Sequence, residues 1–241
     1  MIRESELRWA SLISGGGTTM EAMARSTKEK GELSGVATPA VVIASRSGIA
    51  GIKRAQEFGI PVEQVIRSDY ASTDAYGEAL ISALEKYNPD LVTLNGFLVK
   101  ISESVIEEYE NRIFNQHPGP VPDFGGKGMY GRRVHAAVLF FVKETKMVGH
   151  HTLMTAQRVA PEYDKGAVVG SQKVDIFPGD FPESLQSRSL PVEHKLQIEL
   201  LRDFARGVLT EVQVENFVKS EADFVILEKA KQYAIEAYPN G

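Results

Sequence analysis

Short apolar runs alternate with amphipathic segments over the first half of the chain. The run AVVIAS at residues 40–45 is typical of a buried strand, and residues 74–87 place their apolar side chains on one face of a helix. Apolar runs of this kind between helices are typical of parallel strands that are buried on both faces. The pattern therefore predicts an α/β fold with a Rossmann-like, mostly parallel sheet flanked by helices. The predicted strands are residues 7–13, 36–45, 62–66, 91–94 and 112–115, and the predicted helices are residues 20–30, 49–58, 74–87 and 102–109.

The pattern changes after about residue 130. An irregular loop with Pro and Gly joins two strand-like runs at residues 147–155 and 167–176, so we expect a late antiparallel hairpin. No repeat or obvious linker interrupts the chain. This favours one domain over residues 1–208, with residues 209–241 as a C-terminal extension packed on the same domain. The remaining predicted elements are helices at residues 131–143, 181–207 and 222–237 and a strand at residues 211–218.

The composition narrows the class of protein. Hydrophobic residues make up 43% of the 241 residues, enough to bury a sizeable core, and the formal charge of −5 argues against an extended nucleic-acid surface. The absence of cysteine excludes disulfides, thiolate catalysis and Cys-ligated zinc. The N-terminus lacks the long apolar core of a signal peptide, and no apolar run reaches membrane-spanning length. We expect a cytoplasmic protein that binds neither nucleic acid nor membrane.

A glycine loop, SGGGTT at residues 14–19, lies between the first predicted strand and the first predicted helix. Glycines allow a sharp turn with exposed N–H groups, and a helix N-terminus favours an anion, so a phosphate or carboxylate suits this place. The loop is a poor dinucleotide fingerprint, because Met20 stands where a third glycine would fall and the second strand ends without an acidic residue. A tight turn with a Thr cap remains the alternative.

Two polar side chains, Asn115 and His117, end the strand at residues 112–115, and three prolines follow within five residues. Ligands of open α/β sheets bind at the carboxyl ends of strands. An Asn amide donates hydrogen bonds to an oxyanion, and a His donates to it or exchanges protons near neutral pH. The prolines stiffen the exit. The pair therefore predicts a catalytic strand end, and the alternative is a pair of structural caps.

The segment NQHPGPVP resembles the Asn-x-His-Pro-(x)₃-Pro signature of the folate-dependent formyltransferases, above all the phosphoribosylglycinamide (GAR) formyltransferases. SGGGTTMEAM, NGFLVKIS, APEYDKGAVV and PVEHKL resemble the phosphate loop, folate segment, Asp-x-Gly element and late Glu-His helix of that family, in the same order. The resemblance covers residues 7–208. It implies the formyltransferase fold and transfer of a formyl group from 10-formyltetrahydrofolate to the amine of GAR in purine synthesis, with no metal.

The resemblance also implies the roles of particular residues. Asn115 and protonated His117 would stabilise the negative oxygen of a tetrahedral intermediate, and Asp164 would orient His117 and order a proton-carrying water. The substrate phosphate would bind the backbone of the glycine loop, and Glu193 would meet the glycyl amine or the ribose hydroxyls. The implied substrate-binding residues are Gly16, Gly17, Thr18, Thr19 and Glu193, and those lining the pterin pocket are Leu98, Val99, Lys100 and Ile101.

Several recognition positions depart from the family pattern. Thr73 and Val99 stand where many members carry arginines, Leu153 replaces a histidine, and the stretch QRVAPEY before Asp164 is longer than usual. A sister formyltransferase with another amine substrate, such as a sugar amine, therefore stays open. A formyltetrahydrofolate hydrolase and a Rossmann-like nucleotide-binding module without chemistry are the further alternatives. The expected partners are a phosphorylated small-molecule amine and a folate, and the expected assembly is a monomer or homodimer.

Overall fold

The structure is a computed structural model that describes residues 6–147 and 150–241. The chain divides into two compact units, of which the first comprises Met1–Gln116 with Gln197–Thr210 and the second comprises His117–Leu196 with Glu211–Gly241. The predictions for the extreme N-terminus, and the start of the strand predicted at residues 147–155, fall partly on residues outside the described ones. The predicted domain boundary near residue 208 stays a prediction.

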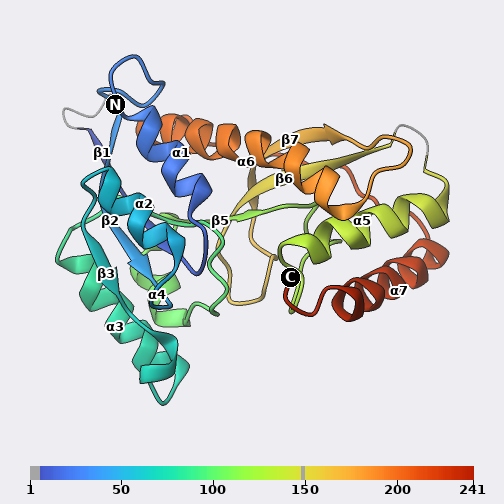
Figure 1. The fold of residues 1–241 in the computed structure, drawn as a ribbon, viewed down its shortest axis with the longest axis horizontal. Coiled ribbons are helices and arrows are strands. Elements are labelled where there is room, and N and C mark those ends of the chain that lie inside the picture. Colours follow the sequence, from blue (N-terminus) through green and yellow to red (C-terminus); the bar gives the residue numbers. More distant parts are fainter. Residues whose placement is uncertain (1–5, 148–149) are drawn as a thin grey trace. The chain divides into compact units, whose positions relative to one another are not determined.

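The first unit contains a parallel sheet with the strand order β3-β2-β1-β4-β5 (Figure 1). The central strands are apolar and fully buried, as expected for strands covered on both faces. The order reverses direction beside β1, which places the carboxyl ends of β1 and β4 at a topological switch point. The predicted mostly parallel sheet is confirmed. The strands are β1 (Leu7–Ile13), β2 (Ala37–Ala44), β3 (Val62–Gln64), β4 (Leu91–Leu94) and β5 (Ile113–His117).

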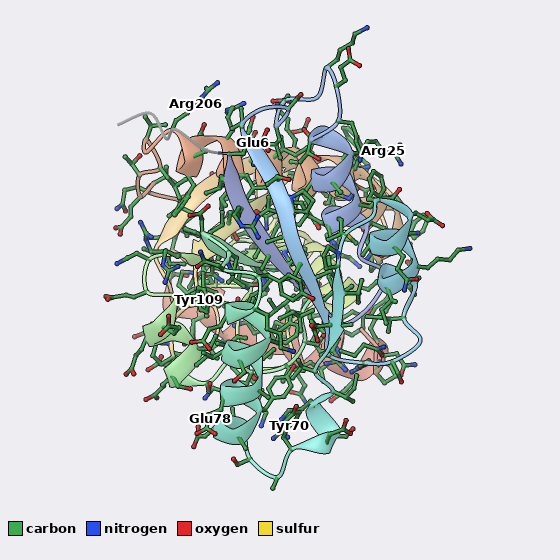
Figure 2. All side chains as sticks on the ribbon, turned by 90° about the vertical axis from the view of Figure 1, so that its left-hand side faces the viewer. Glu6, Arg25, Tyr70, Glu78, Tyr109 and Arg206 are labelled. Atoms are coloured by element: carbon green, nitrogen blue, oxygen red, sulfur yellow. The ribbon has the colours of Figure 1, made fainter. Side chains whose placement is uncertain are left out.

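Crossover helices connect these strands and pack in two pairs, α1 with α2 and α3 with α4. The approach of α1 to α2 requires glycine, because a Cβ on Gly17 would lie 2.9 Å from the Cα of Gly51. Charged side chains such as Arg25 of α1 and Glu78 of α3 lie on the outer sides of their helices (Figure 2). The helices of this unit are α1 (Thr18–Ser26), α2 (Ala50–Glu57), the short 3₁₀ turn η1 (Arg67–Asp69), α3 (Thr73–Glu85) and α4 (Glu103–Glu108).

The second unit contains the antiparallel hairpin of β6 and β7, which confirms the predicted late hairpin. Its register shifts between Ala156 and Gln157 near the end of β6. The long helix α6 begins in this unit and ends in the first, as the chain ranges of the two units show. The elements are α5 (Arg132–Thr145), β6 (His151–Arg158), β7 (Val168–Asp175), α6 (Pro182–Ala205) and α7 (Glu221–Ala237).

The C-terminal helix α7 packs along α5 within the second unit (Figure 1). The rings of Phe140 and Tyr233 stack with centroids 5.3 Å apart. Arg133, which is only 8% exposed, donates hydrogen bonds to the carbonyl oxygens of Gly128, Tyr238 and Pro239 at 2.9, 2.8 and 2.8 Å. A buried guanidinium thus ties the end of the extension to the loop before α5.

One predicted strand does not form, and several predicted element ends differ from the structure by a few residues. The predicted strand at residues 211–218 is wrong, since these residues form no strand. Their backbone bonds individual partners instead of a ladder: the Val212 N–H donates to the Val168 carbonyl, and the N–H groups of Phe217 and Val218 donate to the Asp123 carboxylate. In addition, β5 continues to His117, beyond the predicted end at residue 115.

We expect Arg133→Met to lower the free energy of unfolding by about 2–4 kcal/mol, because three carbonyl groups lose a charged donor in a buried place. Thermal unfolding followed by circular dichroism measures this loss. The matched control is Arg132→Met on the same helix turn, where a half-exposed guanidinium lies 3.5 Å from Glu183 and little stability is expected to depend on it. Equal losses for both variants would contradict a clamping role for Arg133.

Candidate active site

His117 ends strand β5 and is buried, with 3% of its surface exposed. Its Nε2 lies 3.0 Å from the carbonyl oxygen of Phe124. Since a carbonyl only accepts hydrogen bonds, Nε2 carries the proton in this arrangement. The other ring nitrogen, Nδ1, lies 3.6 Å from Oδ1 of Asp164. The structure therefore brings together the predicted histidine and the predicted aspartate.

Asp164 lies in the connection between β6 and β7, with a left-handed backbone (φ 54°) that Asp tolerates better than most residues. Its carboxylate is 9% exposed and accepts two hydrogen bonds, from the Gln157 side-chain amide at 2.7 Å and from the Gly126 N–H at 2.9 Å. Gln157 was not predicted from the sequence. Its side chain is buried and follows the register shift in β6, a kind of irregularity that re-aims side chains in strands.

The glycine-rich turn at residues 125–126 makes room for the aspartate. A Cβ on Gly125 would lie 2.4 Å from the Cβ of Asp164, so a larger residue would displace the carboxylate. The sequence showed only that this loop, DFGGKGMYGRR, contains many glycines. A cavity of about 280 Å³ borders Asp164, and its wall includes Pro122 and the extended residues 211–214.

Burial lowers the pKa of His117, while the Asp164 carboxylate and the Phe124 carbonyl act in the opposite direction. The imidazolium expected from the sequence is thus disfavoured in this state, and the neutral ring is the form to which a substrate proton can move. Burial also lowers the pKa of the neighbouring His135, to about 4, with His117 as the smaller cause. A neutral His135 adds no full positive charge beside His117.

The first unit holds Asn115 and the glycine loop. Asn115 is half-buried and lies two residues before His117 on the same strand, so the two side chains share one face of β5. Gly17 is the N-cap of α1 with φ 70°, and Gly16 is exposed with open space at its Cβ position. Thr18 and Thr19 form the first turn of α1. The loop thus leads into a helix N-terminus, where N–H groups favour an anion.

Ser14 holds the segment at residues 98–101 in place within the first unit. Its hydroxyl accepts the Leu98 N–H at 2.9 Å and bonds the Ser45 hydroxyl at 2.7 Å. Leu98 is 44% exposed, whereas Ile101 is buried, so only part of the predicted pterin-binding segment reaches the surface. Val99 is half-buried and Lys100 is exposed. Ser14 belongs to the predicted glycine loop, whereas its contacts with Ser45 and Leu98 were not predicted from the sequence.

A family model described as formyl transferase matches residues 7–201. The chain belongs to this formyl transferase family. Phosphoribosylglycinamide formyltransferase of Escherichia coli (strain K12) is 30% identical over 82% of this chain and 87% of its own length. The chloroplastic phosphoribosylglycinamide formyltransferase of Arabidopsis thaliana is 30% identical over 95% of this chain and 73% of its own length. The resemblance to the GAR formyltransferases is thereby confirmed.

The chain is also similar to longer relatives and to solved structures of formyl transferases. The chain is 28% identical to the trifunctional purine biosynthetic protein adenosine-3 of Gallus gallus and spans only 19% of that protein. Glycinamide ribonucleotide transformylase 1 of Symbiobacterium toebii superposes with a TM-score of 0.75 at 28% identity, covering 89% of this chain and 93% of its own. Within the described residues, no helix is long and apolar enough to cross a membrane, and no cluster of three metal-ligating side chains occurs.

Glu193, which lies on α6 within the region matched by the formyl transferase family, has an unusual carboxyl group. Burial raises its pKa to about 7. In the unfolded chain the Glu193 carboxyl group has its ordinary pKa, so the folded state holds the proton more tightly than the unfolded state. The resulting stability is fully present below the ordinary carboxyl pKa and is lost as the pH rises through about 7.

Glu193→Gln should therefore raise the free energy of unfolding at pH 8 by on the order of 1–2 kcal/mol, and the melting temperature with it. Near pH 4 the substitution should change both quantities little. Differential scanning calorimetry across this range provides the measurement. Glu183→Gln, at a half-exposed position of the same helix, is the matched control and should show no such pH-dependent gain. A gain that is equal at both pH values would show that ionisation of Glu193 is not its origin.

Proposed function

We propose that this chain transfers the formyl group of 10-formyltetrahydrofolate to the amine of 5'-phosphoribosylglycinamide, a step of purine synthesis. The observation that carries the proposal is the buried His117–Asp164 pair, with 3.6 Å between Nδ1 and Oδ1, following Asn115 on strand β5. The names of the relatives support the substrate pair. A cytoplasmic location of the protein and a monomeric or dimeric state are predictions that accompany this proposal.

In the proposed reaction, the amine nitrogen attacks the formyl carbon, and a tetrahedral intermediate with a negative oxygen forms. Asn115 and His117 donate to this oxygen, the bond from the formyl carbon to the folate nitrogen then breaks, and the folate nitrogen takes up a proton that the amine has lost. In this structure the Nε2–H of His117 is directed to the Phe124 carbonyl. The oxyanion, as the stronger acceptor, must therefore compete with that carbonyl for the same proton.

Asp164 has two roles in the proposed reaction. It stabilises His117 when the ring takes up a proton, because a carboxylate at this distance favours the cation. It is also fixed in place, since the Gln157 amide and the Gly126 N–H each donate to one of its oxygens. The proton that the ring takes up from the amine then passes to the folate nitrogen through a water molecule that Asp164 orders, which returns His117 to its neutral form.

Substrate recognition falls largely on backbone groups. The phosphate of GAR binds the N–H groups at Gly16, Gly17 and the first turn of α1, and the folate lies against residues 98–101. Glu193 receives the amine or the ribose hydroxyls. Its pKa of about 7 means that it is partly ionised at neutral pH, so a cationic amine shifts it toward the carboxylate.

Release of tetrahydrofolate from 10-formyltetrahydrofolate, measured with and without GAR, tests the reaction. We expect release that depends on GAR, and a kcat lowered by about 10²–10³-fold in each of Asn115→Ala, His117→Ala and Asp164→Asn, with small changes in KM. The double change of Asn115 and His117 should cost less than the product of the single effects, because both donors serve one oxygen.

The matched control for these variants is Gln116→Ala, between the two donors on the opposite face of β5. It should keep kcat within a few-fold of the wild type. Release without any amine would instead indicate a hydrolase, and release only with a sugar amine would indicate a sister enzyme. Intact transfer in His117→Ala, together with a lower melting temperature, would make the histidine a structural cap and contradict the catalytic assignment.

A change at the glycine loop separates phosphate binding from folate binding. Gly16→Val should raise the KM for GAR by roughly tenfold or more and leave the KM for the folate nearly unchanged, because the new side chain covers the N–H groups at the start of α1. Gly16 is the suitable position because its Cβ meets nothing within 4 Å, whereas a side chain on Gly17 would also strain the fold. Steady-state kinetics with each substrate varied in turn gives both constants. Equal losses for both substrates would show that the loop serves folding.

A further inference from the structure

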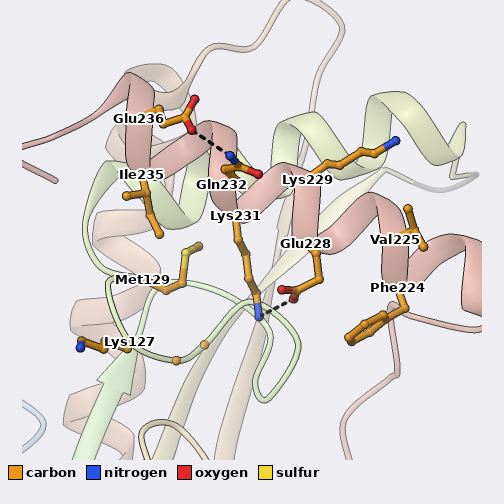
Figure 3. Close-up of a pocket in the computed structure, with 12 residues that line it drawn as sticks. Lys127, Met129, Phe224, Val225, Glu228, Lys229, Lys231, Gln232, Ile235 and Glu236 are labelled. Atoms are coloured by element: carbon orange, nitrogen blue, oxygen red, sulfur yellow. Dashed lines mark hydrogen bonds and ion pairs between the residues drawn. The ribbon is translucent and has the colours of Figure 1, made fainter.

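A cavity of about 670 Å³ lies between helix α7 and the glycine-rich loop before α5, entirely within the second unit (Figure 3). Gly125 and Gly126 line it from the loop, and Lys229 and Lys231 line it from α7. Helix α7 follows the part of the chain that the family model matches, which ends at residue 201. The cavity therefore joins a segment outside the matched region to the turn beside the candidate active site.

The two lysines of α7 differ in their surroundings. The side chain of Lys231 is 21% exposed and extends into the cavity, where its Nζ lies 3.9 Å from Oε1 of Glu228 (Figure 3). Lys229 extends in another direction, away from that ion pair (Figure 3). The Glu228 side chain is 57% exposed, so solvent weakens this ion pair and the charge of the largely buried Lys231 ammonium also acts on other groups nearby.

The turn at residues 125–126 separates this ammonium from the Asp164 carboxylate. One side of the turn lines the cavity, and the other side contacts the aspartate: the Gly126 N–H donates to Oδ2, and Gly125 abuts the Asp164 side chain. The backbone of these two glycines thus borders both the cavity that Lys231 lines and the Asp164 side chain.

Charged groups from several elements face Lys231. Burial is the main cause of its lowered pKa, Lys165 acts in the same direction, and the carboxylates of Glu228, Asp123 and Asp164 act against it. Around His117, the positive charge of Lys231 disfavours the imidazolium, while Asp164 favours it. His135 faces the ring as well, with its own pKa lowered mainly by burial.

We propose that Lys231 is a positioning residue for the Asp164–His117 pair. Its ammonium stabilises the Asp164 carboxylate across the glycine turn and keeps the imidazole neutral until the attacking amine releases its proton. The assignment rests on the proposed function, since it concerns the same pair, and it gives the C-terminal helix a role in the reaction. Lys231 touches neither substrate and acts through Asp164.

The first measurement is an NMR titration of the His117 ring in Lys231→Met, with the His117 signals assigned by comparison with His117→Gln. The ring pKa should rise by on the order of half a unit or more, because an opposing positive charge is removed. Lys231→Arg keeps the charge and should restore the wild-type value. Lys229→Met, the matched control on the same helix turn, should leave the value unchanged.

The second measurement is the pH profile of kcat for formyl transfer. The acidic limb should move to higher pH in Lys231→Met by the same shift, while kcat at high pH and both KM values stay within a few-fold of the wild type. A purely structural lysine would lower the melting temperature without moving this limb. Should Lys231→Met fail to fold, Lys231→Gln takes its place in both measurements.

An unchanged His117 pKa in folded Lys231→Met or Lys231→Gln would overturn the proposal, and so would an equal shift in Lys229→Met. The titration needs no substrate, so its result stands even if GAR is not the acceptor. Loss of formyl transfer in the wild type would contradict the proposed function alone. A missing pKa shift in an active enzyme would contradict the role of Lys231 alone.

Discussion

A carboxylate buried beside an imidazole is the interaction on which the candidate site depends. The Asp164 side chain is 9% exposed, and a buried carboxylate is tolerated only where hydrogen-bond donors replace the lost water. The Gln157 amide and the Gly126 N–H supply those donors, and His117 lies within 4 Å. Loss of any one of these groups leaves the buried carboxylate with fewer partners in a place of low polarity. The hairpin, the glycine turn and the end of strand β5 are therefore constrained together.

One short loop contacts both members of the pair. The Phe124 carbonyl accepts the hydrogen bond of His117, and two residues later the Gly126 N–H donates to Asp164. The same loop is anchored by Asp123, whose carboxylate accepts the N–H groups of residues 217 and 218 in the C-terminal extension. The rings of Phe124 and Phe217 also meet edge to face, with centroids 6.0 Å apart. The extension thus supports the loop that sets the geometry of the pair.

The sequence predicted the sheet well because buried parallel strands leave a strong signal. The run AVVIAS became β2, and residues 91–94 became β4 with the predicted bounds. The prediction from sequence was wrong at residues 211–218, where alternating valines suggested a strand. The N–H groups of this segment donate instead to individual acceptors, the Val168 carbonyl of β7 and the Asp123 carboxylate. Polar side chains at residues 115–117 suggested that β5 ended early, but ladder hydrogen bonds use the backbone and do not depend on side-chain polarity.

The candidate site was predictable only in part, because sequence patterns report local spacing and not contacts between distant residues. Asn115, His117 and Asp164 stand in motifs whose spacing is local, whereas Gln157 reaches Asp164 through a register shift that no local pattern reveals. Nor does any sequence signal relate Lys231 to a turn more than a hundred residues earlier.

In the proposed function, recognition by backbone groups and recognition by side chains tolerate sequence change differently. A phosphate bound by N–H groups at the start of α1 does not depend on whether residues 18 and 19 are threonines, and a folate held against the backbone of residues 98–101 tolerates Val99. The buried pair has no such freedom, because each oxygen of Asp164 is bonded by a particular donor. In the proposed function, discrimination between amine acceptors depends on the few side chains that carry charge. We propose Glu193 as one of these, because its pKa of about 7 makes its charge responsive to a cationic amine at neutral pH.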